Sequence, residues 1–146
     1  MQRTVLLLPG IVAFCLLPCL GCGQSGPVRG DVQGKVTVDG ESVENGAIVF
    51  TPLEGIEGAP MQYEIKGGTY SSAATGKGVP VGKNSVYISG TKPTGRQSLN
   101  FVTGEMSDDF VEYIPAKYNE RTTLEVEVED GNNTFDFELE GKPTQR

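Results

Sequence analysis

The sequence predicts an all-β protein, and three observations support this prediction. Apolar and polar residues alternate with period two in several short runs, most clearly in residues 122–129 (TTLEVEVE) and 134–140 (TFDFELE). Turn residues such as Asn45 and Gly46 separate the runs. After residue 21, valine and threonine, which favour strands, greatly outnumber leucine. We therefore expect a single seven-stranded antiparallel β-sandwich with Greek-key connections.

Seven short runs are expected to form the strands. In order, they are residues 32–38, 47–51, 62–65, 69–72, 85–89, 122–129 and 134–140. The alternation within these runs predicts which side chains face the core. These are Val36, Val38, Ile48, Phe50, Ile65, Tyr70, Val86, Ile88, Leu124, Val126, Val128, Phe135, Phe137 and Leu139.

The N-terminal residues differ sharply from the rest. Arg3 is followed by an apolar run over residues 5–20, and no further charge occurs before Arg29. Because Pro9, Gly10 and Pro18 interrupt the run, it is too short and broken for a good transmembrane helix. We interpret residues 1–21 as a secretory signal peptide.

The end of this run, Cys19-Leu20-Gly21-Cys22, resembles a bacterial lipobox. The resemblance implies cleavage before Cys22 and lipid attachment to that cysteine, although Cys19 stands where the motif usually has Leu. An ordinary signal peptide is the alternative. In lipoproteins the residue after the lipidated cysteine helps to select the membrane, and Gly23 favours the outer over the inner membrane.

Four segments follow from this interpretation. We expect residues 1–21 to be the lipoprotein signal peptide and residues 22–30 to be the lipidated cysteine with a flexible tether. Residues 31–141 are expected to form the β-sandwich domain, and residues 142–146 a C-terminal tail. The partner implied by the first two segments is a membrane, contacted through the N-terminal lipid in the cell envelope.

The composition excludes several classes of function. The chain has 146 residues, no His and a formal net charge of -7. The absence of His excludes Ser-His-Asp and Cys-His hydrolases and His-ligated zinc. The acidic balance argues against nucleic acid, which needs clustered Lys and Arg. We expect no enzyme, no cofactor and no small-molecule substrate.

Several segments resemble the carboxypeptidase regulatory-like domain, a seven-stranded transthyretin-related β-sandwich. The resemblance lies in residues 32–40 (VQGKVTVDG), 45–50 (NGAIVF), 68–70 (GTY) and 79–83 (VPVGK). Residues 114–119 (IPAKYN) and 122–139 look like small bacterial lipoproteins that carry this domain. The resemblance implies the fold and no catalytic residues. In residues 114–119 we expect Tyr118 to bury its ring and bond a backbone group at a corner of the sandwich.

The stretch from residue 90 to residue 112 shows no clear strand pattern, and a loop of this length is usually functional or disordered. It contains Phe101, Asp108, Asp109 and Phe110, which we take as the candidate partner-binding residues. The partner would be an envelope protein or polymer. A variable loop without a function is the alternative.

Acidic residues raise two further possibilities. Six carboxylates alternate along the last two expected strands, and as a hairpin they would share one face: Glu125, Glu127, Glu129, Asp136, Glu138 and Glu140. In the turn between them, Asp130 and Asn132 offer oxygen ligands that hard cations prefer, although both are also usual turn residues. We expect a solvated face and a turn, with a divalent-cation site as the alternative.

These observations predict a non-catalytic, lipid-anchored envelope module with a structural or binding role. One alternative is a Ca²⁺-responsive carbohydrate-binding or adhesion module. The other is a weak carboxylate-based hydrolase, which would need a cleft with converging acids.

Overall fold

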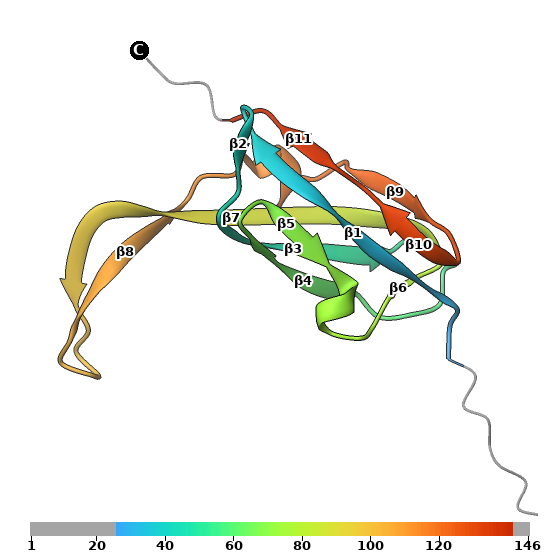
Figure 1. Ribbon diagram of the computed structural model, residues 1–146, viewed down its shortest axis with the longest axis horizontal. Helices are drawn as coiled ribbons and strands as arrows, with labels where there is room; N and C mark the ends of the chain where they lie inside the picture. The colour runs from blue at the N-terminus through green and yellow to red at the C-terminus, as the bar shows by residue number, and fades with distance from the viewer. Residues whose placement is uncertain (1–25, 142–146) are drawn as a thin grey trace, which may run out of the picture.

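The computed structural model describes residues 26–141, and these residues form an all-β structure, as the sequence predicts (Figure 1). Two short 3₁₀ turns, η1 (Ser72–Ala74) and η2 (Ala116–Tyr118), interrupt the strands. The eleven strands are β1 (Arg29–Val38), β2 (Glu41–Ser42), β3 (Asn45–Pro52), β4 (Met61–Lys66), β5 (Thr69–Ser71), β6 (Val79–Pro80), β7 (Gly82–Leu99), β8 (Met106–Glu112), β9 (Glu125–Val128), β10 (Gly131–Thr134) and β11 (Phe137–Leu139).

The strands form one open, mostly antiparallel sheet in the order β10-β1-β5-β4-β3-β7-β8. Strands β2, β6 and β11 also pair with β1, and β9 pairs with β7. Strands β10 and β11 run parallel to β1, which the sequence analysis did not expect. The expected last strand is divided in two at Phe135 and Asp136, where the Lys35 amide donates to Asp136 Oδ1 at 2.8 Å instead of to a neighbouring strand.

The core agrees closely with the predicted set of inward-facing residues. All of them are buried except Leu124, Val126 and Phe135, which are half-buried and pack against the core. Three aromatic rings join the strands across it, with Phe50 6.0 Å from both Tyr63 and Tyr70 between ring centroids. The sequence analysis missed five buried residues, most of them outside the long alternating runs: Val32, Val43, Tyr63, Val79 and Ile114.

Two glycines let the last strands approach β1. A Cβ on Gly34 would collide with the Phe135 carbonyl oxygen, and one on Gly30 would collide with that of Glu129. Only a residue without a side chain allows backbone to pass so closely. Gly30 and Gly34 therefore position β10 and β11 along β1.

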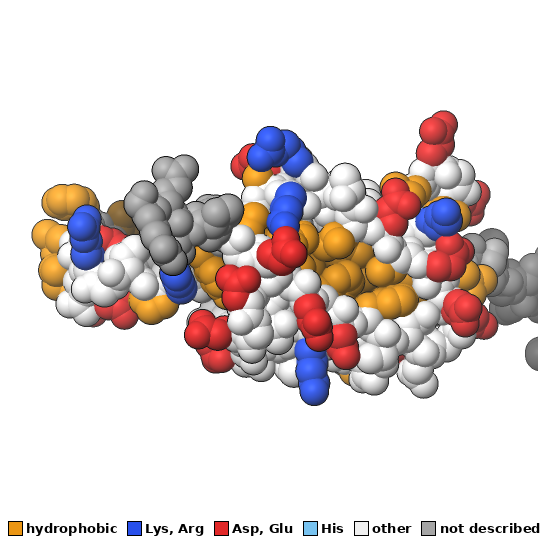
Figure 2. All heavy atoms as spheres, turned by 90° about the horizontal axis from the view of Figure 1, so that it is seen from above, with side chains coloured by type: hydrophobic (Ala, Val, Ile, Leu, Met, Phe, Trp, Pro, Cys, Tyr) orange, Lys and Arg blue, Asp and Glu red, His pale blue; other side chains and the backbone are white. Residues whose placement is uncertain are grey.

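The six alternating carboxylates are all exposed, as expected from the pattern, but they do not lie on one hairpin. Strand β9 pairs with β7, whereas β10 and β11 pair with β1, and within residues 26–141 no strand pair joins β9 to β10 or β11. The six carboxylates therefore do not share one face of a hairpin, and that expectation is wrong. On this side of the molecule Figure 2 shows an apolar strip with acidic side chains along it, and Leu124, Val126 and Phe135 are the half-buried apolar residues of these segments.

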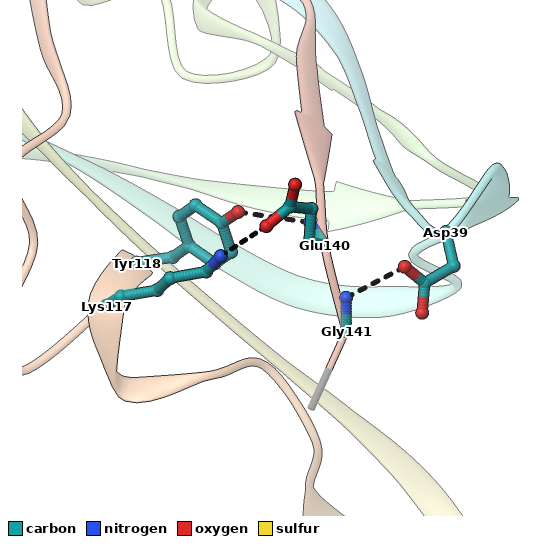
Figure 3. Close-up of polar contacts among 5 residues, drawn as sticks. All are labelled: Asp39, Lys117, Tyr118, Glu140 and Gly141. Atoms are coloured by element: carbon teal, nitrogen blue, oxygen red, sulfur yellow. Dashed lines mark hydrogen bonds and ion pairs between the residues drawn. The ribbon is translucent and has the colours of Figure 1, made fainter. Parts of the chain in front are cut away.

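Polar contacts hold the end of the described chain against the body (Figure 3). The Tyr118 hydroxyl accepts a hydrogen bond from the Glu140 amide at 3.0 Å, and Lys117 Nζ lies 2.7 Å from Glu140 Oε2. The Gly141 amide donates to Asp39 Oδ1 at 2.9 Å. Tyr118 is half-buried and bonds a backbone amide, as expected, while its expected place at a corner of a sandwich stays a prediction.

The expected signal peptide (1–21), the expected lipidated Cys22 with residues 23–25, and the tail (142–146) lie outside the described residues. Residues 26–30 of the expected tether are described, and the last two of them, Arg29 and Gly30, already belong to β1 instead of to a tether. Among residues 26–141, no helix is long and apolar enough to cross a membrane.

Candidate functional site

The most distinctive surface of the molecule is a hairpin that projects from the body (Figure 1). It consists of residues 91–112: the outer half of β7, a turn, and β8. We call it the arm. The expectation of a loop without strands between residues 90 and 112 is therefore wrong. Almost every residue of the arm is exposed on both faces, so burial imposes no apolar alternation that the sequence could have revealed.

A bulge divides the arm into two ladders. Near the body Thr91 pairs with Glu112, and beyond the bulge Gln97 pairs with Asp108 and Leu99 with Met106. Residues 94–96 of β7 lie opposite the single residue Asp109 of β8, so β7 carries two extra residues here, and Gly95 takes a positive φ of 77°. Such a bulge increases local twist and redirects the strand. It fits the curve of the arm away from the body in Figure 1.

Apolar side chains gather at the free end of the arm, where Figure 2 shows a hydrophobic group on the left. Phe101 and Val102 in the turn are 93% and 94% exposed. Leu99 and Met106 face each other at the last strand pair, and Phe110 follows on the same face of β8 as Met106. Each of these three is also exposed. Asp108 separates Phe110 from Met106 on this face, so the apolar group at the free end consists of Leu99, Phe101, Val102 and Met106. Exposed apolar side chains gathered in this way mark interaction sites.

The structure brings the four candidate partner residues onto this one element. Phe101 lies in the turn and Phe110 on β8, whereas Asp108 and Asp109 point to opposite faces of β8. Asp108 Oδ1 accepts from Gln97 Nε2 and Asp109 Oδ2 from Ser98 Oγ, both at 2.9 Å. These carboxylates therefore bridge the two strands and do not converge.

Glu112 fixes the arm at its root. Its carboxylate accepts hydrogen bonds from the Gly90 amide at 3.1 Å and from the Ile114 amide at 2.9 Å. One side chain thus holds both strands at the point where they leave the body. Gly90 is packed tightly, since a Cβ there would lie 3.0–3.1 Å from Val43 and Ile114. The sequence analysis did not identify this role, because no local pattern distinguishes Glu112 from the other acidic residues nearby.

Tyr113 follows Glu112 and also lies at the root of the arm. Burial raises the pKa of its phenol, and the negative charges of Glu112, Glu41 and Glu44 raise that pKa further. Lys92 Nζ lies 5.2 Å from the centre of the Tyr113 ring, within the range of a cation–π contact. Burial of the ring and its contact with Lys92 both keep the first strand pair of the arm in place.

Two hollows lie on the body. One, of about 760 Å³, lies beside β1, β4 and β5, and its charged lining residues are Lys35, Glu64, Lys66 and Asp136. The other, of about 640 Å³, lies at the root of the arm and is lined by four acidic residues: Asp39, Glu41, Glu44 and Glu112. Two of these, Asp39 and Glu112, accept hydrogen bonds from backbone amides, and Glu41 and Glu44 are exposed. The acids of the second hollow therefore serve local structure or face solvent.

The cation candidates Asp130 and Asn132 are exposed beside a turn built by their neighbour. The Asn133 side chain accepts from the Glu129 amide at 2.9 Å and donates to the Glu129 carbonyl at 2.9 Å. Within the described part of the chain, no group of three or more His, Cys, Asp or Glu residues is placed to hold a metal ion. The turn interpretation accounts for the geometry of residues 129–133.

Comparisons with protein-family models, curated proteins and solved structures find no match to this chain. A function must therefore be inferred from the projecting arm, with its apolar end and its fixed root.

Proposed function

We propose that this protein is a non-catalytic binding module of the cell envelope, and that the arm is its binding element. The observation that carries the proposal is the exposed apolar end of the arm, where Phe101 and Val102 are almost fully in solvent. Neither side chain belongs to the hydrophobic core, so stability of the body does not explain them. Binding residues are commonly carried on segments that a rigid scaffold holds out.

The root supports this proposal. A binding element that must keep its orientation benefits from being ordered before contact, because ordering on binding costs free energy. Glu112 bonds backbone on both sides of the hairpin, and Asp108 and Asp109 cross-link its strands. The arm is therefore preorganised, as a binding element needs to be.

The location belongs to the same proposal. The lipobox-like sequence that ends at Cys22 supports lipid attachment, and Gly23 favours the outer membrane. The body is proposed to be a Greek-key β-sandwich related to the carboxypeptidase regulatory-like domain. The buried core between the strands and the turns at Gly40 and Gly68 are compatible with such a domain. Its partners are the membrane and an envelope protein or polymer.

A photo-cross-linking experiment tests where binding occurs. A photoreactive phenylalanine replaces Phe101 in the full chain, expressed in cells with an intact envelope. The matched control carries the same group at Tyr87, an exposed aromatic residue on the body half of β7. We expect position 101 to give a discrete cross-linked product that position 87 does not give. Equal labelling at the two positions would refute the arm as the binding element.

Mass spectrometry of the same material tests the anchor. The proposal predicts that the chain begins at Cys22 and carries acyl groups there. An unmodified cysteine at that position, or cleavage elsewhere, would reject lipid attachment and leave the cross-linking result to be judged separately.

A further inference from the structure

The turn at the end of the arm combines apolar side chains with amides that are mostly hydrogen-bonded within the turn. Asn100 Oδ1 accepts from the amides of Val102 at 2.9 Å and Thr103 at 3.2 Å. The Gly104 amide donates to the Asn100 carbonyl at 2.7 Å, and the Asn100 amide donates to the Glu105 carbonyl at 2.8 Å. The turn therefore presents Phe101 and Val102 outward while most of its amides are paired internally.

Internal pairing of the amides lowers the free-energy cost of moving the turn out of water. A non-aqueous medium supplies no partners for backbone groups, so each unpaired amide or carbonyl placed there is costly. A turn whose amides bond within itself avoids much of that cost. The combination of paired amides and protruding apolar side chains suits a lipid surface better than a polar polymer.

The position of the turn agrees with a lipid surface. In Figure 1 the arm curves toward the same side of the body as the point where the chain enters β1. Residues 5–20, the apolar run of the sequence, lie upstream of that point. A flat surface along this side of the molecule would meet both the start of β1 and the end of the arm.

We infer that the end of the arm inserts shallowly into the lipid surface that holds the N-terminal segment, as a second point of attachment. This inference rests on the proposed function and names the partner of the arm. Phe101 and Val102 enter the lipid, with Leu99 and Met106 at its boundary. The carboxylate of Glu105, in the turn, and those of Asp108 and Asp109, further up β8, remain in water and limit the depth.

A second copy of the chain is a weaker occupant. Strand β8 is the last strand of the sheet, and antiparallel pairing of two β8 strands would bring Asp108 and Asp109 of one copy against those of the other. At a lipid surface these carboxylates can stay in the aqueous phase, away from the apolar contact. The proposed N-terminal anchor also makes the contact intramolecular, which raises its effective concentration.

Tryptophan fluorescence tests the inference, because the chain contains no Trp. Phe101→Trp introduces a single fluorophore at the end of the arm, and Tyr87→Trp provides the matched control on the body. All three cysteines lie at or before residue 22, so the full chain is coupled by thiol addition to a maleimide-headgroup lipid included in vesicles of phosphatidylethanolamine and phosphatidylglycerol. This coupling places the N-terminal segment at the surface whether or not cells acylate Cys22.

For Phe101→Trp we expect a blue shift of emission on coupling, and a loss of intensity when the vesicles contain lipids brominated near the headgroup. Tyr87→Trp should show neither change. Adding Val102→Asp to Phe101→Trp should remove the shift and the quenching, while circular dichroism verifies that the fold is unchanged.

Emission and quenching that are the same for the two single variants would overturn the inference. A protein captured at position 101 in cells, together with no quenching in vesicles, would replace the lipid partner by a protein and leave the proposed binding function standing. Quenching of the Phe101→Trp variant in vesicles without acylation of Cys22 in cells would support the arm contact and refute the lipid anchor.

Discussion

Tyrosine hydroxyls join parts of this chain that are far apart in sequence. The Tyr70 hydroxyl donates to the Phe135 carbonyl at 2.8 Å, and the Tyr63 hydroxyl donates to the Lys77 carbonyl at 2.7 Å. Both residues are buried in the core. Burial raises the pKa of Tyr70 well above its usual value, and the charge of Asp136 adds to the effect. These phenols must stay protonated for the core to remain as it is.

A pH dependence follows from Tyr63. Burial raises its pKa from 10.0 to about 12, with Arg29 opposing the shift and Asp31 adding to it. The unfolded chain therefore loses this proton first, so the free energy of unfolding is unaffected below pH 10 and falls as the pH rises toward 12. Urea unfolding at a series of pH values measures the slope.

The variant Tyr63→Phe serves as the control for this prediction. It should lower stability at neutral pH by about 1 kcal/mol through one lost hydrogen bond. It should also reduce the alkaline loss of stability, although not abolish it, because Tyr70 contributes in the same direction. If stability fell with pH as steeply in this variant as in the unaltered chain, the alkaline loss could not be assigned to Tyr63.

Within the arm, Glu112 is predicted to set the orientation. Glu112→Ala removes the acceptor of two backbone amides and should cost about 2 kcal/mol in local stability, since hydrogen bonds to a charged group are among the stronger ones. Hydrogen exchange of the Gly90 and Ile114 amides measures this loss of local stability directly and should become faster. Glu105→Ala, near the exposed turn, is the matched control and should leave both amides unchanged. Unaltered exchange in Glu112→Ala would show that the root does not depend on this side chain.

The charges of β8 are predicted to keep the arm from pairing with other copies. An exposed edge strand is a template for association, and charged residues on it oppose that association. The double variant Asp108→Asn with Asp109→Asn should therefore self-associate at concentrations where the unaltered chain is monomeric. Analytical ultracentrifugation measures this, with Glu105→Gln as a single-charge control. A double variant that stays monomeric would remove the protective role.

The elements that the sequence predicted correctly are those with one buried face. Residues such as Ile48, Phe50, Val86 and Ile88 alternate because one side of β3 and β7 faces the core. The arm was missed because the same strand β7 continues beyond Thr91 with neither face buried. Phe101 and Phe110 were still recognised as candidates, since large aromatic residues in a polar segment require an explanation. Their arrangement on one rigid hairpin depends on pairing between β7 and β8, which local pattern does not encode.

At the scale of the molecule, the last strands β10 and β11 return to run beside β1, the first strand of the described chain. This packing depends on Gly34, and Gly34→Ala would place a methyl group against the Phe135 carbonyl. We expect a loss of about 1–3 kcal/mol, as for other overpacked sites, measured by thermal or urea unfolding. Gly26→Ala is the control, because nothing lies within 4 Å of the added carbon. Equal stability of the two variants would mean that the close approach is not required.

The sequence could not reveal that β10 and β11 pair with β1. The run 134–140 reads as one continuous strand, whereas the structure divides it between β10 and β11 and pairs both with β1 in parallel. Parallel or antiparallel pairing leaves the same alternation in a sequence, so only the tertiary arrangement distinguishes them. The inward positions were predicted well, and the partners of the strands were not.

Methionine oxidation in cells tests the central claim, that the arm is the binding surface of a protein that we propose to be anchored in the envelope. Met106 lies near the end of the arm and is 58% exposed, whereas Met61 packs against the core and serves as the internal reference. Mass spectrometry compares their oxidation rates in the anchored protein and in protein released into solution. The account predicts that anchoring slows oxidation of Met106 relative to Met61. An unchanged ratio would mean that nothing covers the arm where the protein resides, and would contradict the account.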